Sequence, residues 1–159
     1  MATYPLAKLI GLRSHRVDEA QRNRMLAQKK VEQAQTAIKQ KIQEIEDYKV
    51  WKEEETVRRY DNVMYKELSN DAFEKFKQDL ANLNIGELKL QDELRVLKEE
   101  EETLKNELDK AKVAVKQATA DLNKLEEHKK IWLEMQRIEN ERKEESELED
   151  FHTKKNEFG

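Results

Sequence analysis

The residue types that most often carry out chemistry are sparse in this sequence or are spaced so that they cannot act together. His15, His128 and His152 are far apart, and none has a second histidine four residues away on the same helical face, as a helical metal site requires. The four glutamates at 99–102 could suggest paired catalytic carboxylates, but consecutive residues of a helix point in different directions. We interpret this run as a solvated helix face.

Other signals of catalysis or of export from the cytoplasm are also missing from the sequence. It contains no cysteine, which excludes disulfides and thiolate ligands, and it has no glycine-rich phosphate loop or serine-centred elbow. No apolar run approaches the roughly 20 residues of a membrane span, and the first residues lack the features of a secretory signal. The sequence predicts a cytoplasmic protein that is not an enzyme, binds no metal or cofactor and does not insert into a membrane.

The composition is compatible with either a disordered chain or a chain of long helices. Charged residues make up 42% of the 159 residues and apolar residues 36%, with three glycines and one proline. Heptad spacing decides between the two outcomes, because 14 of the 16 a and d positions from Phe73 to Leu125 are apolar. A weaker seam runs from Leu6 to Tyr48. We therefore predict an all-α fold, a long antiparallel two-helix coiled-coil hairpin.

The helix signals divide the chain at a single bend. Pro5 suits the first position of a helix, and Ser69, Asn70 and Asp71 are turn and N-cap residues. The expected organisation is one hairpin domain over residues 1–159. It has a first helix at about 5–68, a bend at about 69–71, a second helix at about 71–150 and a frayed acidic C-terminal tail.

The position of the bend predicts which residues face each other. The heptad phases allow cross-helix partners whose numbers add to 135 or 142, and only 142 agrees with a bend near 70. This register sets Lys41 opposite Glu101, the two oppositely charged interruptions of the seam. It also sets the irregular stretch 52–60 opposite 82–90, which contains Gly86, so a kink or a loosened segment is expected there, either a local packing defect or a functional hinge.

Charge and aromatic residues are unevenly distributed. Residues 8–41 hold nine Lys or Arg against three acidic residues, whereas Glu139–Asp150 holds seven acidic residues against two basic ones. The basic stretch lacks interleaved aromatics, so we favour an acidic protein surface over nucleic acid as its partner. Exposed aromatics often mark binding surfaces. The candidate contacts near the bend are Tyr48, Trp51, Tyr60, Tyr65, Phe73 and Phe76.

Two short motifs resemble a known family. The opening Tyr4-Pro5-Leu6, followed by Leu9, Leu12-Arg13 and Arg16-Val17-Asp18-x-Ala20, is similar to the start of the type III secretion stalk proteins of the YscO/FliJ family, in particular the injectisome branch. The second motif, His128-Lys129-Lys130-x-Trp132, resembles the C-terminal region of the same family.

The resemblance implies a hairpin stalk that binds the hexameric export ATPase by the end holding both termini. It also implies contacts with the membrane-embedded export gate and with the escort chaperones of secreted substrates, which would meet the aromatic bend. The ATPase-contacting residues that it implies are Leu6, Ile10, Arg13, Arg16, Val17, Trp132, Met135 and Ile138.

The preferred function is thus a cytoplasmic stalk at the inner face of a secretion apparatus, coupling the export ATPase to the gate. The free chain is expected to be a monomer, because the hairpin satisfies its own seam. Two alternatives remain: a holdase-type chaperone or escort hairpin that holds substrates at the bend, and a structural coiled-coil scaffold without a motor partner.

Overall fold

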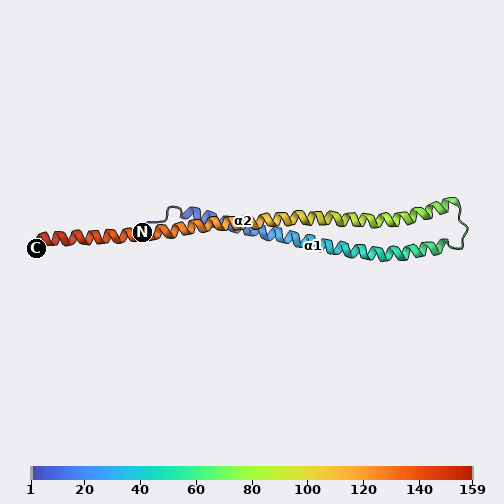
Figure 1. Cartoon of the computed structure of the whole chain (residues 1–159), viewed down its shortest axis with the longest axis horizontal. Helices are drawn as coiled ribbons and strands as arrows, with labels where there is room; N and C mark the ends of the chain where they lie inside the picture. The colour runs from blue at the N-terminus through green and yellow to red at the C-terminus, as the bar shows by residue number, and fades with distance from the viewer. Residues whose placement is uncertain (1, 159) are drawn as a thin grey trace. The chain divides into compact units, whose positions relative to one another are not determined.

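Residues 2–158, which the computed structural model describes, form two long α-helices. Helix α1 spans Ala7–Val63 and helix α2 spans Asn70–Phe158, with one connection between them (Figure 1). Side chains far apart in sequence meet across the pair in antiparallel order, as with Lys41 and Glu93 or Arg59 and Asp79. The predicted all-α antiparallel two-helix hairpin is confirmed.

The chain divides into two compact units, and each contains a segment of both helices. The terminal unit comprises the residues up to Arg24 together with those from Ala111 onward, and the bend unit comprises Met25–Lys110. In each unit the seam is formed by one α1 segment against one α2 segment.

Helix α1 is shorter at both ends than the predicted range of 5–68. The chain turns at Pro5, where the Ala7 amide donates to the Tyr4 carbonyl at 3.2 Å, and the helix begins at Ala7. It ends at Val63 because Tyr65 takes a left-handed conformation, with φ of 67°. A residue in this conformation just past the last turn commonly terminates a helix. The connection therefore covers 64–69 instead of 69–71.

Helix α2 begins as the sequence indicates but continues further. Ser69 caps it, since its hydroxyl accepts from the Ala72 amide at 3.2 Å and its carbonyl accepts from the Phe73 amide at 3.0 Å. The frayed tail expected after residue 150 is not observed, because α2 extends to Phe158. Arg137 contacts Glu134 and Glu141 on its own helix, and Lys155 lies in the last turn, where a cation favours the helix dipole.

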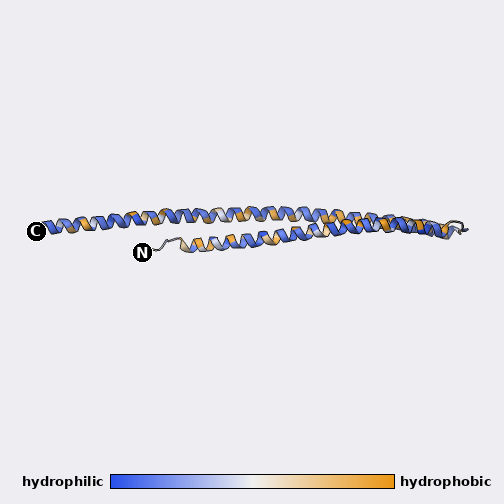
Figure 2. Ribbon diagram, turned by 90° about the horizontal axis from the view of Figure 1, so that it is seen from below, coloured by the Kyte–Doolittle hydropathy of each residue, from blue (hydrophilic) through white to orange (hydrophobic). Residues whose placement is uncertain are grey.

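The core is one side chain thick and follows the predicted seams. Apolar residues are interspersed among hydrophilic ones along both helices (Figure 2). Six buried residues occupy predicted a or d positions: Ala20, Val31, Ile45, Leu83, Leu108 and Leu125. Each seam is narrow, so a small side chain such as that of Ala20 is enough to fill the space between the two helices.

The register differs from the predicted one. Lys41 forms an ion pair with Glu93 at 2.8 Å, whereas Glu101 pairs with Lys105 of its own helix at 3.1 Å. The numbers of the cross-helix partners add to between 131 and 139, from Tyr48 with Leu83 to Lys52 with Glu87. The predicted pairing of Lys41 with Glu101 is wrong, because the connection lies several residues earlier and shifts the helices by about one heptad.

The kink expected at Gly86 stays a prediction, and Gly86 lies inside the helical span of α2 from Asn70 to Phe158. Gly86 makes room for the ring of Tyr48: a Cβ built at Gly86 would overlap the Tyr48 hydroxyl. That hydroxyl donates to the Leu83 carbonyl at 2.7 Å. In residues 2–158 neither helix contains a stretch long and apolar enough to cross a membrane.

Candidate interaction surfaces

The eight residues proposed from the resemblance as ATPase contacts all belong to the terminal unit. Ile10, Arg13, Val17 and Trp132 are half-buried in or beside the seam, whereas Arg16 is exposed. Leu6, Met135 and Ile138 are also exposed, and Met135 is 64% accessible. The set therefore contains both half-buried seam residues and exposed surface residues.

Arg13 has a structural role that its sequence position did not indicate. Its guanidinium Nη1 donates to the backbone carbonyl of Asp121 at 3.0 Å, which ties α1 to α2. A shallow groove beside this contact is lined by Arg13, Arg16, Ala114, Gln117, Ala118 and Asp121. Arg16 lines the same groove while remaining exposed, and is thus the cation of this pair that is available to a partner.

Several cations of the terminal unit are not neutralised by the chain itself. Among the side chains of residues 2–156, no carboxylate lies within ion-pair distance of Arg16, Arg22, Arg24, Lys112 or Lys116. A second shallow groove collects three of them around apolar side chains and is lined by Arg24, Lys112, Val113, Val115, Lys116, Thr119, Ala120 and Asn123. This surface can attract an acidic protein face.

Tyr4 is a structural residue that the heptad pattern missed. It precedes helix α1, yet only 4% of its surface is accessible. Its hydroxyl is hydrogen-bonded to His128 Nδ1, and its ring packs edge-on against Trp132 with centroids 5.5 Å apart. The motifs around Tyr4 and Trp132, which gave the family resemblance, are thus in contact and fix the first residues of the chain on α2.

The last part of α2 is acidic and has no α1 partner. Residues 137–156 are all exposed, including the apolar side chains of Leu148 and Phe151. Arg137 lies between Glu134 and Glu141, and this arrangement raises the arginine pKa and lowers that of Glu134. The remaining carboxylates leave this segment strongly negative.

The six predicted aromatic contacts all lie in the bend unit, but they are not equivalent. Tyr60 and Phe76 pack edge-on across the two helices with centroids 5.2 Å apart, and Tyr48 lies 5.4 Å from Trp51. Lys77 Nζ lies 4.6 Å from the centroid of the Phe73 ring. Tyr65 is fully exposed, and Trp51 is 46% exposed. Tyr48 and Phe76 are thus half-buried, whereas Trp51, Tyr60, Tyr65 and Phe73 are exposed.

Ion pairs between α1 and α2 in the bend unit shift the pKa values of side chains that form them. Lys52 Nζ contacts Glu87 at 2.5 Å, and this hydrogen bond lowers the pKa of the glutamate. The contact of Lys41 with Glu93 lowers the pKa of that carboxyl and, together with Glu44, raises the pKa of the lysine. The Glu87 and Glu93 carboxylates are therefore ionised at neutral pH.

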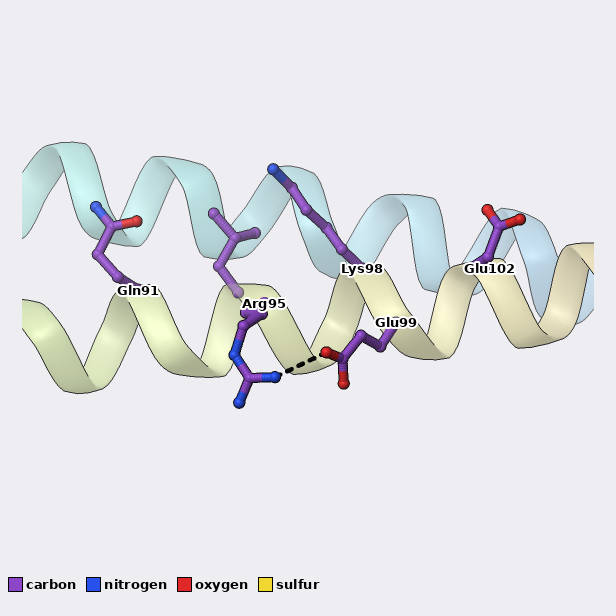
Figure 3. Close-up of a pocket in the computed structure, with 6 residues that line it drawn as sticks. Gln91, Arg95, Lys98, Glu99 and Glu102 are labelled. Atoms are coloured by element: carbon purple, nitrogen blue, oxygen red, sulfur yellow. Dashed lines mark hydrogen bonds and ion pairs between the residues drawn. The ribbon is translucent and has the colours of Figure 1, made fainter.

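The surface depressions are open grooves. One in the bend unit is lined only by α2 side chains, Gln91, Leu94, Arg95, Lys98, Glu99 and Glu102. Figure 3 shows Arg95 paired with Glu99 and pointing away from α1, at an Nη1–Oε1 distance of 2.7 Å. Among residues 2–158 no three histidine, aspartate or glutamate side chains are placed to hold a metal ion. What the arrangement offers is charged and aromatic surface for binding.

Fold and surface together define a class: a two-helix coiled-coil protein with a cation-lined groove on its terminal unit and a cluster of aromatics on its bend unit. The sequence model of the family described as type III secretion protein YscO matches residues 6–154. The chain belongs to this family of type III secretion proteins.

Comparison with solved structures agrees with the hairpin fold. A structure described as that of a YscO homologue, CT670 from Chlamydia trachomatis, is similar with a TM-score of 0.79. The two chains are 22% identical, and the similarity covers 96% of this chain and 94% of that one. No curated protein sequence matches this chain.

Proposed function

We propose that this protein is the cytoplasmic stalk of a type III secretion apparatus. Its terminal unit binds the hexameric export ATPase, and its bend unit contacts the export gate and the escort chaperones of secreted substrates. In this role it couples ATP hydrolysis to the gate at the inner face of the membrane. The free chain is a monomer, because its apolar seam is covered by its own two helices.

One observation carries the proposal: each unit exposes a surface suited to binding. The terminal unit presents the exposed Arg16 and Arg22 and a groove lined by Arg24, and the bend unit presents Trp51 and Tyr65. Complementary charge favours orientation and fast association, whereas exposed aromatics supply the buried anchors of an interface. A protein that couples the export ATPase to the export gate needs two such surfaces.

Binding to the purified cognate ATPase hexamer tests the proposal. Arg16→Glu together with Arg22→Glu should weaken the affinity by about tenfold or more, since each tenfold change corresponds to about 1.4 kcal/mol. Arg13 is left in place because it supports the hairpin. Raising the salt concentration should weaken wild-type binding as well. The matched control, Trp51→Ser with Tyr65→Ser, should bind the hexamer like the wild type.

A holdase or escort hairpin is the second candidate, and the same exposed aromatics favour it. Trp51 and Tyr65 would then hold unfolded substrate. Suppression of client aggregation, with no effect on the ATPase, would support the holdase. A structural scaffold without a motor partner would show neither effect.

A further inference from the structure

The seams of the two helices are compatible with a second register. Heptad seams fit each other again after a slide of one full repeat, so the a and d positions allow partners whose numbers add to 135 or to 142. The observed cross-helix contacts, with sums from 131 to 139, belong to the first of these registers. A slide of α1 along α2 by one heptad, about 10 Å, leads to the second.

The observed register leaves two charged interruptions of the seam at separate levels. At a sum of 135, Glu101 faces Ala34 and Lys41 faces Leu94. The Glu101 side chain is only 20% accessible, and its ion pair is with Lys105 of the same helix, which is 45% accessible. Charges in a seam are costly unless an opposite charge lies close by. In the second register Lys41 and Glu101 face each other, so two mismatched levels become one ion pair.

The connection between the helices consists of residues that can extend α1. Residues 64–68 are Met, Tyr, Lys, Glu and Leu, four of which are among the better helix formers. Helix α1 ends before them because Tyr65 has a φ of 67°, a region that is unfavourable for a residue with a bulky side chain. If α1 continued to Leu68, Tyr65 would take a helical conformation and lose this strain.

The displacement of the connection matches the slide. With α1 extended, the bend would move from 64–69 to the turn and capping residues Ser69, Asn70 and Asp71. Its midpoint would move by about half a heptad along the chain. This is the displacement that a slide of one full heptad produces in a hairpin, because the slide adds residues to one helix and removes them from the other.

Specific contacts hold the register that the bend selects. Gly86 is the only glycine in the sequence between residues 70 and 158, and it makes room for the Tyr48 ring. After the slide Glu93 would lie where Gly86 now lies, and the Tyr48 ring would lose this space. In the terminal unit, Tyr4 packs against Trp132 in the same register, with centroids 5.5 Å apart. The observed register is therefore the more populated one.

We propose that the hairpin is a two-state register switch, in which α1 slides along α2 by one heptad while residues 64–68 join α1. The contact of Tyr48 with Gly86 favours the observed state, whereas relief of strain at Tyr65 favours the other. Steps of one helix past another are discrete because the seams match only after a full repeat. Since α1 belongs to both units, a ligand that prefers one register at either unit shifts the population at the other.

Thiol cross-linking inside the bend unit measures the two states. The reporters combine Lys41→Cys with Glu93→Cys for the observed register, with Glu101→Cys for the second, and with Asp109→Cys for neither. Asp109 lies eight residues beyond Glu101, about 12 Å along α2, and is out of reach in both registers. Each pair is compared with itself in several backgrounds, so the loss of its native side chains affects all backgrounds equally.

Substitutions at the contact and at the connection should change the cross-linking rates in opposite directions. Gly86→Ala should raise the rate of the 41/101 pair several-fold and lower that of the 41/93 pair, because the added Cβ displaces the Tyr48 ring. Tyr65→Gly should lower the rate of the 41/101 pair, because glycine adopts the left-handed turn without strain. Gly11→Ala, whose Cβ would meet no atom within 4 Å, should change neither rate.

Three results would overturn the register switch. If Gly86→Ala raises the 41/101 and 41/109 rates together, the helices separate and do not slide. If Gly86→Ala leaves the 41/101 rate unchanged, the second register is not accessible to the hairpin. If Tyr65→Gly leaves the 41/101 rate unchanged or raises it, the strain in the connection is not coupled to the register.

Discussion

The contact between Gly86 and Tyr48 changes how a glycine inside a helix is interpreted. From sequence, Gly86 predicts a weak point, because glycine lowers helix stability by about 1 kcal/mol relative to alanine. In the structure, the missing side chain lets the Tyr48 ring approach α2 and its hydroxyl reach the Leu83 carbonyl at 2.7 Å. Glycine here leaves room for the Tyr48 ring to pack between the helices.

Gly11 provides a matched control, since a Cβ at this position would have no atom within 4 Å. Gly11→Ala should stabilise the protein by up to about 1 kcal/mol through helix propensity. Gly86→Ala should destabilise it by about 1 kcal/mol or more, because the displaced Tyr48 loses its hydrogen bond and packing. Urea denaturation followed by circular dichroism measures both. Equal stabilisation by the two substitutions would contradict this role of Gly86, whereas in a Tyr48→Ala background Gly86→Ala should become favourable.

Periodicity predicted the seam residues correctly but could not predict the contacts of single polar or aromatic side chains. Ala20, Val31, Ile45, Leu83, Leu108 and Leu125 are buried because the heptad spacing puts them on the facing stripes. Tyr4 precedes the first helix and belongs to no heptad. Its burial against His128 and Trp132 arises from a chain segment that turns back onto α2, which periodicity does not describe.

At the scale of the helices, the register depends on where the connection lies. A heptad seam fits its partner equally well after a shift of one full repeat, so the bend alone selects the register. The sequence places the bend at the capping residues 69–71, but α1 already ends at Val63. Tyrosine rarely adopts the left-handed conformation that ends this helix, so the residue type gave no signal of the early stop.

The register can be tested by cross-linking inside the bend unit, because the chain has no cysteine of its own. Lys41→Cys with Glu93→Cys should react efficiently with a short thiol cross-linker, as the native side chains approach to 2.8 Å. Lys41→Cys with Glu101→Cys should react poorly, since eight further helical residues add about 12 Å along α2. Peptide mapping after digestion identifies the products. More efficient cross-linking of the second pair would instead support the register expected from sequence, in which Lys41 lies opposite Glu101.

At the scale of the whole molecule, net charge hides the distribution that matters for binding. The formal charge of −4 combines a basic stretch at residues 8–41 with an acidic segment at the end of α2. Charge segregation and membership of a secretion family could both be inferred from sequence. Which cations remain unpaired could not, because pairing depends on side-chain approach across the helices. Arg13 bonds to a backbone carbonyl, whereas Arg16 is free to meet a partner.

The central claim is that the terminal unit engages the motor and the bend unit does not. The rate of ATP hydrolysis by the cognate hexamer, measured against stalk concentration, tests it most directly. Circular dichroism first confirms that every variant has wild-type helicity. The wild type and the Trp51→Ser/Tyr65→Ser variant should stimulate hydrolysis equally, and the Arg16→Glu/Arg22→Glu variant should not stimulate it. Stimulation that survives in the terminal variant but is lost in the bend variant would contradict the account.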